Sequence, residues 1–297
     1  MLGVRAISPI VDRVHETRLA YQNGHWVSAA HLRVSIADPA VTQGVSAVER
    51  IRAYRGKLFQ VETHLQRWKQ STEVLRVAKL PNRDELLSLI DQTLQKNRAW
   101  IAGNENFGVL LLASPGVQGK ATFVIDLYAI DEQLIQRRTT SGMPLVVTDV
   151  MQPDPSCWPR NIKVRSRLHY YLADQFAQDQ DPDAIGVLLD NDGTITETSI
   201  ANVLIVENGC LVSPFIERIL FGVSMQAVVK IAADLKLDWL QEPISPERMS
   251  RADEVLLTGS SCGIWFANRI DGQATPSNRP VYQSLRKGFD QLIGKSR

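Results

Sequence analysis

The sequence has few cysteines, no long apolar run and no excess of either charge. Its three cysteines, Cys157, Cys210 and Cys262, lie far apart and form no Cys-x-x-Cys pair, which argues against a disulfide framework and favours a reducing compartment. The longest apolar runs, such as the one at 109–113, are far too short to span a bilayer. A net charge of +1 lacks the basic excess of proteins that bind nucleic acid or acidic membranes. We therefore expect a soluble cytoplasmic protein with neither a nucleic-acid partner nor a membrane partner.

The sequence also lacks a signal-peptide pattern and a metal-binding motif. Asp12, Arg13 and Glu16 interrupt the N-terminal segment, which has no continuous apolar core, so we do not expect a signal peptide. The five histidines show no His-Glu-x-x-His pattern and no close ligand spacing. No metal site is therefore predicted, and a metallohydrolase is a remote alternative.

What is present is the composition of an ordinary globular protein, with 44% hydrophobic and 22% charged residues. A chain of 297 residues exceeds the usual size of one compact core, which predicts two domains. Strands and helices are interspersed without a regular strand-helix-strand alternation, which is typical of α+β domains. The polar, turn-rich segment 137–144 is predicted to link a domain of residues 1–136 to a domain of residues 145–297.

Short-range patterns predict the individual elements. An alternating segment at 32–37 predicts a strand, and Arg55-Gly56 between two half-buried strands predicts a hairpin turn. Apolar residues at helical spacing predict helices at 63–78 and 83–97. A strand at 254–260 is the last predicted element, and the rest of the chain is expected to form a tail.

Lys163 is the first candidate for chemistry, because it lies at the edge of a predicted helix and is flanked by Arg165 and Arg167. Neighbouring cations and burial both lower the pKa of a lysine, which makes the free amine available for imine formation. An isolated lysine in a basic stretch is more often a solvated surface residue. Its position alone therefore does not decide between the two interpretations.

Glu197 is the second candidate, on or just beyond a predicted strand. A carboxylate buried among Ile195, Ile200 and Val203 needs a partner, because an unpaired buried charge is costly. A protonated pyridine nitrogen would be such a partner. A surface glutamate that faces water explains the same pattern equally well.

Three further features are candidates for an anion site. Gly222, Val223 and Ser224 precede a predicted helix whose free N–H groups could bind an anion, although a simple capped helix is the commoner explanation. Ser260 ends a predicted strand among small hydroxyl residues that could donate to a phosphate. Arg67 alone would be an exposed charge on a helix.

Taken together and in this order, these features resemble the class IV aminotransferases, the fold-type-IV group of pyridoxal-phosphate enzymes. That family includes branched-chain aminotransferases, D-amino-acid aminotransferases and aminodeoxychorismate lyase. The resemblance covers nearly the whole chain. It implies two α+β domains with pyridoxal 5′-phosphate between them, usually in a homodimer.

The resemblance also implies roles for the candidate residues. Lys163 matches the catalytic Schiff-base lysine, and Glu197 matches the acid that pairs with the pyridine nitrogen. Arg67 matches the phosphate-binding arginine of the family's His-x-x-Arg pattern, which begins here at His64. The remaining implied cofactor contacts are Gly222, Val223, Ser224 and Ser260.

The departures from the family's pattern concern the substrate. Val48 stands where an aromatic residue often lines the substrate pocket, and Leu168 stands where branched-chain enzymes usually have a tyrosine. The stretch that follows Lys163 is closer to the lyase pattern. We predict Arg52 and Arg165 as contacts for the substrate carboxylate.

The predicted function is an aminotransferase that acts between an amino acid and a 2-keto acid, branched-chain-like or related. An aminodeoxychorismate-type lyase and a non-catalytic protein that has kept the fold are the alternatives. The preferred donor and its stereochemistry stay open.

Overall fold

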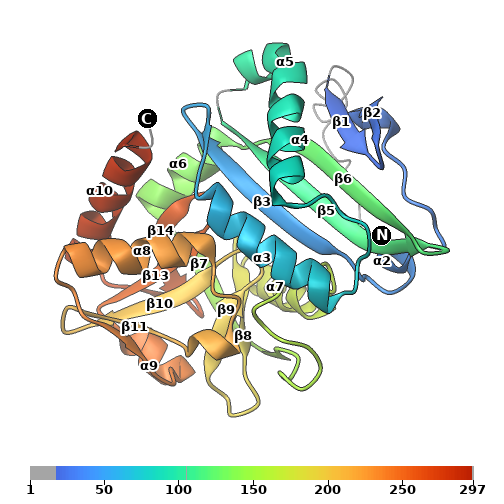
Figure 1. Ribbon diagram of the computed structural model, residues 1–297. Helices are drawn as coiled ribbons and strands as arrows, with labels where there is room; N and C mark the ends of the chain where they lie inside the picture. Colours follow the sequence, from blue (N-terminus) through green and yellow to red (C-terminus); the bar gives the residue numbers. More distant parts are fainter. Residues whose placement is uncertain (1–17, 105, 296–297) are drawn as a thin grey trace, which may run out of the picture.

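The computed structural model describes residues 18–104 and 106–295, and its strands form two sheets (Figure 1). The first sheet is antiparallel and contains β1 (Leu19–Gln22), β2 (His25–Ser28), β3 (Ala47–Tyr54), β4 (Lys57–Leu58), β5 (Phe107–Val117) and β6 (Lys120–Ala129). Its strand order is β2-β1-β6-β5-β3-β4. The first half of the chain therefore builds one complete sheet.

Helices α3 (Val61–Val74) and α4 (Arg83–Lys96) cover one face of this sheet (Figure 1). Asn82 and Glu85 form a capping box that fixes the start of α4. Alternate residues of β3, among them Ala47 and Ile51, pack against these helices because side chains alternate between the faces of a strand. Three short helices complete this half: η1 (Ala29–His31), α2 (Pro39–Thr42) and α5 (Arg98–Ala102).

The second sheet contains β7 (Met143–Met151), β8 (Ile185–Leu189), β9 (Ile195–Thr198), β10 (Asn202–Glu207), β11 (Cys210–Ser213), β12 (Trp239–Gln241), β13 (Glu254–Gly259), β14 (Gly263–Ile270) and β15 (Gln273–Ala274). Its main order is β12-β11-β10-β13-β14-β7-β8-β9. Because β9 also pairs with β10, six of these strands close into a ring. The closing pair is Glu197 and Asn202.

The ring has an apolar interior and a helix-covered exterior. Along β10, Val203 and Ile205 point into the interior cluster, whereas Leu204 and Val206 pack against α8 (Val223–Asp234) and α10 (Pro280–Lys295). The other helices of this half are α7 (Leu168–Gln180), α9 (Pro246–Arg251) and η2 (Ile216–Arg218). Because side chains alternate along a strand, β10 contributes to both the interior core and the core under the helices.

The segment predicted as a linker, 137–144, is not a loop, and that prediction is wrong in its local structure. Helix α6 (Glu132–Ser141) occupies most of it, and β7 begins at Met143. Asp131 caps α6 by accepting from the Leu134 N–H, and Thr140 donates to the carbonyl of Gln136, so the polar residues belong to a helix surface. The change of sheet between β6 and β7 supports a two-domain division, which stays a proposal.

The other local predictions divide into confirmed and wrong ones. The helices at 63–78 and 83–97 and the hairpin at Arg55-Gly56 are confirmed, with φ of 51° and 77° at the turn. The strand at 32–37 is wrong: this segment has no partner strand, and Ile36 is 83% exposed. The expected tail contains β14, β15 and α10, so it is a packed part of the second half.

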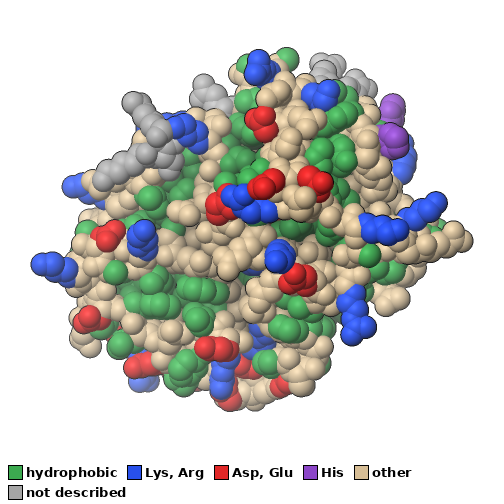
Figure 2. Space-filling model, in the orientation of Figure 1, with side chains coloured by type: hydrophobic (Ala, Val, Ile, Leu, Met, Phe, Trp, Pro, Cys, Tyr) green, Lys and Arg blue, Asp and Glu red, His purple; other side chains and the backbone are tan. Residues whose placement is uncertain are grey.

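None of the described helices is long and apolar enough to cross a bilayer. Figure 2 shows positive and negative side chains mixed over one face of the molecule. A cytoplasmic location stays a prediction.

Candidate active site

The seven residues predicted to hold a cofactor line one cavity, although they come from distant parts of the chain. The seven residues are Arg67, Lys163, Glu197, Gly222, Val223, Ser224 and Ser260. Arg67 lies on helix α3, Lys163 in the loop before α7, and Glu197 on strand β9. The start of α8 and the end of β13 supply the other four. Both halves of the chain therefore contribute to the cavity.

Backbone hydrogen bonds fix the Lys163 segment to the first half of the chain. The Val48 N–H donates to the carbonyl of Lys163 at 3.0 Å, and the Arg165 N–H donates to the carbonyl of Ser46 at 2.9 Å. The N–H of Lys163 itself donates to the hydroxyl of Ser71 on α3 at 3.0 Å. These bonds hold the base of the lysine side chain in place at the cavity.

Lys163 has an amine of unusually low basicity. Burial, together with repulsion from the Arg67 guanidinium, lowers its pKa to about 8. At neutral pH roughly a tenth of such amines is uncharged, whereas an ordinary lysine is almost fully protonated. The amine is thus available for bond formation and proton transfer.

Glu197 is buried, and four donors bind its carboxyl group. Its Oε1 accepts from the Tyr170 hydroxyl at 2.6 Å and from Gln152 at 3.1 Å. Its Oε2 accepts from Asn202 at 3.0 Å and from the Leu220 N–H at 3.2 Å. Burial raises the pKa of Glu197, while the hydrogen bond from Tyr170 opposes this shift. The four donors fix the carboxyl group in one orientation.

Arg67 is held by a buried carboxylate. Glu49 accepts from Nε and Nη2 of Arg67 at 2.7 and 2.8 Å, and Nδ1 of His64 lies 2.7 Å from the same carboxylate. Burial alone would raise the pKa of Glu49, but the Arg67 guanidinium lowers it to about 2. No described residue accepts a hydrogen bond from Nη1 of Arg67. This nitrogen is therefore left for an anion at the cavity.

The rest of the anion site combines a helix N-terminus with a hydroxyl that lacks a partner. Helix α8 begins after Gly222 without a side-chain cap, so its first N–H groups are not satisfied by a capping side chain. A Cβ atom at Gly222 would lie 2.4 Å from Oδ1 of Asn202, which explains the glycine. Thr258 lines the cavity, and its buried Oγ1 has no hydrogen-bond partner among the described residues. A cation, free N–H groups and a hydroxyl together fit a phosphate group.

The three residues predicted to contact substrate are not on the wall of this cavity. Val48 is buried under the Lys163 segment. Arg52 donates to the carbonyl of Ser261 and to Asn106, so its guanidinium is engaged elsewhere. Arg165 is exposed. Arg167, for which the sequence predicts no substrate contact, does line the cavity.

The sequence reasoning also missed residues that hold the predicted ones in place. These are Glu49, Gln152, Tyr170, Asn202 and Thr258. Little in the sequence indicates their role, because each is a common polar residue whose partner lies far away in the sequence. Asn202 is the exception, since it follows Glu197 by five residues across a tight turn.

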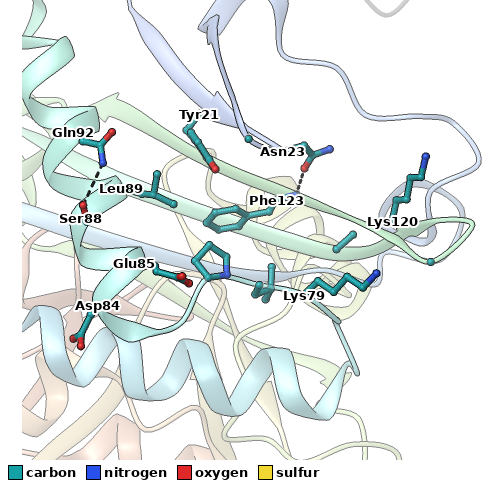
Figure 3. A pocket seen from close by; sticks show the side chains of 15 residues that line it. Tyr21, Asn23, Lys79, Asp84, Glu85, Ser88, Leu89, Gln92, Lys120 and Phe123 are labelled. Carbon is teal, nitrogen blue, oxygen red and sulfur yellow. Dashed lines mark hydrogen bonds between the residues drawn. The ribbon is translucent and has the colours of Figure 1, made fainter.

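A wider hollow on the first half of the chain is separate from this cavity. It measures about 870 Å³ and lies between α4, the β1–β2 turn and the β5–β6 hairpin, where Tyr21, Lys79 and Phe123 line it (Figure 3). None of the predicted site residues borders it. Among residues 18–104 and 106–295, no group of three or more His, Cys, Asp or Glu side chains is placed to hold a metal ion.

The family model described as amino-transferase class IV matches residues 46–270. The chain belongs to the class IV aminotransferases. The match contains Arg67, Lys163, Glu197 and the anion site. The predicted family and enzyme class are confirmed.

Known proteins of this family resemble the chain at low identity. A putative branched-chain-amino-acid aminotransferase of Methanocaldococcus jannaschii is 29% identical over 276 residues, which cover 90% of this chain and 92% of that protein. Branched-chain-amino-acid aminotransferase-like protein 1 of Arabidopsis thaliana is 25% identical over 272 residues, or 89% of this chain. The chain spans only about half the length of that plant relative, since the match covers 48% of it.

A solved structure confirms the fold of this class IV aminotransferase. The branched-chain amino acid aminotransferase from Escherichia coli has a TM-score of 0.82 and 22% sequence identity, and the match covers 93% of this chain and 94% of that one. The prediction of an α+β, fold-type-IV architecture is therefore confirmed.

Proposed function

We propose that the chain is a pyridoxal-phosphate-dependent aminotransferase that moves an amino group between an amino acid and a 2-keto acid. The observation that carries this proposal is one cavity that contains a weakly basic amine, a buried carboxyl group and an anion site. These are the three groups that a phosphorylated pyridine aldehyde needs. Family membership and the fold support pyridoxal 5′-phosphate as the cofactor, as the sequence predicted.

Different residues of the cavity would bind different parts of the cofactor. Nη1 of Arg67, the first N–H groups of α8 and the hydroxyls of Thr258 and Ser260 would hold the phosphate. Glu197 would hold the proton of the ring nitrogen, because its carboxyl group is buried and oriented by four donors. When bound, pyridoxal phosphate supplies an aldehyde that combines with amines and a ring that delocalises negative charge.

Lys163 would hold the cofactor until substrate arrives and would then move the proton. Its Nζ, with a pKa near 8, accepts a proton from the α-carbon of the amino acid in the uncharged form and returns it in the charged form. The hydrogen bonds to Val48 and Ser71 keep the lysine at the cavity during both steps. Transfer of the amino group in two halves predicts ping-pong kinetics.

The test is a cofactor measurement followed by a donor panel. Purified protein incubated with pyridoxal phosphate and reduced with borohydride should carry the cofactor on the peptide that contains Lys163, and Lys163→Ala should carry none. Branched-chain, acidic and D-amino acids are then offered with 2-oxoglutarate or pyruvate as acceptor. A protein that takes up no cofactor would refute the proposal and favour the non-catalytic alternative.

An aminodeoxychorismate-type lyase is the second candidate, because the stretch after Lys163 is closer to the lyase pattern. Aminodeoxychorismate, tested beside the panel with and without an acceptor, distinguishes the two activities. A lyase would form product without a keto-acid acceptor, whereas transfer requires one.

A homodimer is the proposed assembly. Helix α7 has a stripe of exposed apolar side chains at helical spacing: Leu168 (70% exposed), Tyr171 (61%), Leu172 (48%) and Phe176 (43%). Such a stripe on a surface helix is typical of an interface. Light scattering on the eluting protein should give twice the mass of one chain, and Leu172→Glu with Phe176→Glu should shift it towards one. An unchanged mass in the double variant would place the interface elsewhere.

A further inference from the structure

The hollow on the first half of the chain has a floor that contains two aromatic rings. Tyr21 on β1 and Phe123 on β6 lie edge to face, with ring centres 5.9 Å apart. Leu80 and Pro81 from the α3–α4 loop and Leu89 from α4 complete the apolar lining (Figure 3). A concave surface of about 870 Å³ with such a lining is typical of sites that bind small molecules. We call this site the α4 hollow.

The acidic side chains of the α4 hollow are bonded to their own neighbours. Glu85 accepts from the Asn82 N–H in the capping box, and Asp84 accepts from Arg83 at 2.6 Å. Both carboxylates lie in the first turn of α4, where the helix dipole favours negative charge. They therefore stabilise the start of the helix, and they are not left to bind the cation of a ligand.

The polar side chains that remain available at the α4 hollow can donate hydrogen bonds. Lys79 and Lys120 are exposed, and no ion pair between the described residues includes either of them. The Tyr21 hydroxyl points into the hollow, and no residue in the described part of the chain bonds to it. These groups need an acceptor from a ligand, and the two cations favour one with negative charge.

The charges are separated along the α4 hollow. In the view of Figure 3, both lysines lie at one end, the carboxylates of Asp84 and Glu85 lie at the other, and the aromatic rings lie between them. An anion is therefore attracted to the lysine end and repelled from the α4 end. A ligand with one acid group and an apolar body has a single favourable orientation in this field.

We propose that the α4 hollow binds an aromatic carboxylic acid. Its ring packs against Tyr21 and Phe123, because aromatic rings prefer edge-to-face and offset contacts with one another. Its carboxylate lies between Lys79 and Lys120, which have no other counter-charge. The hollow shares no lining residue with the cavity at Lys163, so this inference does not rest on the proposed function.

Two probes, 2-naphthoate and 2-naphthamide, test the role of charge, because they have nearly the same shape and only the first is an anion. The protein is loaded with pyridoxal phosphate and reduced with borohydride, so that the cavity at Lys163 is occupied. Calorimetry should show that naphthoate binds about fivefold or more tightly than naphthamide. Lys79→Ala and Lys120→Ala should each weaken naphthoate binding about twofold to fivefold, as for an exposed ion pair. Naphthamide binding should not change, and Lys287→Ala, a change to an exposed lysine on α10, is the control.

A bulky side chain inside the α4 hollow tests where the probes bind. Ser88 is exposed on α4 and lines the hollow, whereas Gln95, about two turns further along the same helix, is exposed but does not line it. Ser88→Trp should therefore remove most of the binding of both probes, and Gln95→Trp should leave it unchanged. Melting temperatures check that both variants are folded. Because Ser88 lies outside the cavity at Lys163, this comparison locates the site even if no cofactor binds there.

Four results would overturn the proposal. Equal affinity of the wild-type protein for the two probes would mean that the lysines do not select an anion. A preference for naphthoate that persists in the Lys79 and Lys120 double variant would place the selecting charge elsewhere. Unchanged binding in Ser88→Trp would place the probes outside the α4 hollow. A dissociation constant above about 1 mM for naphthoate would show that the hollow does not bind aromatic acids.

Discussion

Glu49 binds both Nε and Nη2 of Arg67, at 2.7 and 2.8 Å, and its side chain is fully buried. A two-point contact of this kind fixes the plane of the guanidinium as well as its position. His64, the first residue of the His-x-x-Arg pattern, contacts the same carboxylate. The phosphate arginine is thus one member of a buried group of three side chains.

Removal of the Glu49 charge should weaken binding of the cofactor through its phosphate. Glu49→Gln keeps the size of the side chain but leaves the buried Arg67 charge unpaired, which costs about 3–5 kcal/mol in typical buried pairs. We expect a lower melting temperature and an affinity for pyridoxal phosphate that falls about tenfold or more. Affinity is measured by absorbance titration.

Pyridoxal without its phosphate is the control for this prediction. A positioning role for Glu49 predicts that Glu49→Gln weakens binding of pyridoxal phosphate far more than binding of pyridoxal. Equal losses for the two compounds would show that Glu49 acts only on stability.

The amine of Lys163 should titrate near pH 8. Since its pKa is lowered, the uncharged form dominates above about pH 8 and is lost as the pH falls below that value. The rate at which apoprotein forms the covalent bond to pyridoxal phosphate should therefore rise with pH and level off above about 8. Stopped-flow absorbance measures this rate, and an inflection near the ordinary lysine value of 10.5 would contradict the prediction.

Arg67→Gln provides a second check on the same group. The Arg67 charge is the largest contribution after burial to the lowered pKa of Lys163, so its removal should move the inflection to higher pH. An inflection that stays in place would show that the Arg67 charge does not contribute to the shift.

The residues that line the cavity could be predicted from the sequence better than the residues that hold them in place. Lys163, Glu197 and Arg67 could be found because a family pattern names them and their order along the chain is distinctive. Tyr170 and Gln152 could not, because a hydrogen bond between residues 27 or 45 positions apart leaves no mark in one sequence. Local patterns likewise located α3 and α4 but not the segment 32–37, where alternation without a partner strand produced no strand.

The residues that contact substrate were the hardest to predict, for a related reason. The prediction of Arg52 rests on the family's pattern and that of Arg165 on its two-residue distance from Lys163, but the neighbours of a side chain depend on the face of the strand and on bonds across the chain. Arg52 donates a hydrogen bond to the carbonyl of Ser261 in the second half, 209 residues away. Arg167 reached the cavity because the chain turns into α7 directly after it.

Glu197→Gln should abolish turnover and leave cofactor binding largely intact. The amide keeps a similar shape but carries no negative charge to hold a proton on the ring nitrogen, so the ring would delocalise charge less well. We expect kcat to fall by a factor of about 100 or more, on the order of other electrostatic contributions to catalysis. Near-normal activity in this variant would refute the role assigned to Glu197.

Tyr170→Phe should lower activity through the same carboxyl group, but by less than Glu197→Gln. It removes the 2.6 Å hydrogen bond to Glu197 and keeps the carboxyl group, which retains Gln152, Asn202 and the Leu220 N–H as donors. One hydrogen bond to a charged group contributes about 1.5–3 kcal/mol. Activity should therefore fall less than in Glu197→Gln, and the reverse order would show that Tyr170 itself acts on substrate.

Asp190→Asn should destabilise the loop that carries Lys163. Arg160, three residues before Lys163, donates to both carboxylate oxygens of Asp190, and both side chains are buried. Loss of one partner leaves a buried charge and costs about 3–5 kcal/mol of unfolding free energy. Arg160 also donates to the carbonyls of Pro153 and Arg218, so these bonds should keep the variant folded. Chemical denaturation measures the loss.

The pH dependence of this ion pair has a definite sign. Although burial would raise the pKa of Asp190, the hydrogen bond from Arg160 brings it below the ordinary value of 3.8. A carboxyl group with a lowered folded-state pKa stabilises the protein above its unfolded pKa and loses that contribution as the pH falls through the folded value. The stability difference between wild type and Asp190→Asn should thus be constant above about pH 5 and shrink below about pH 4. A difference that persists in acid would mean that the Asp190 charge does not stabilise the loop.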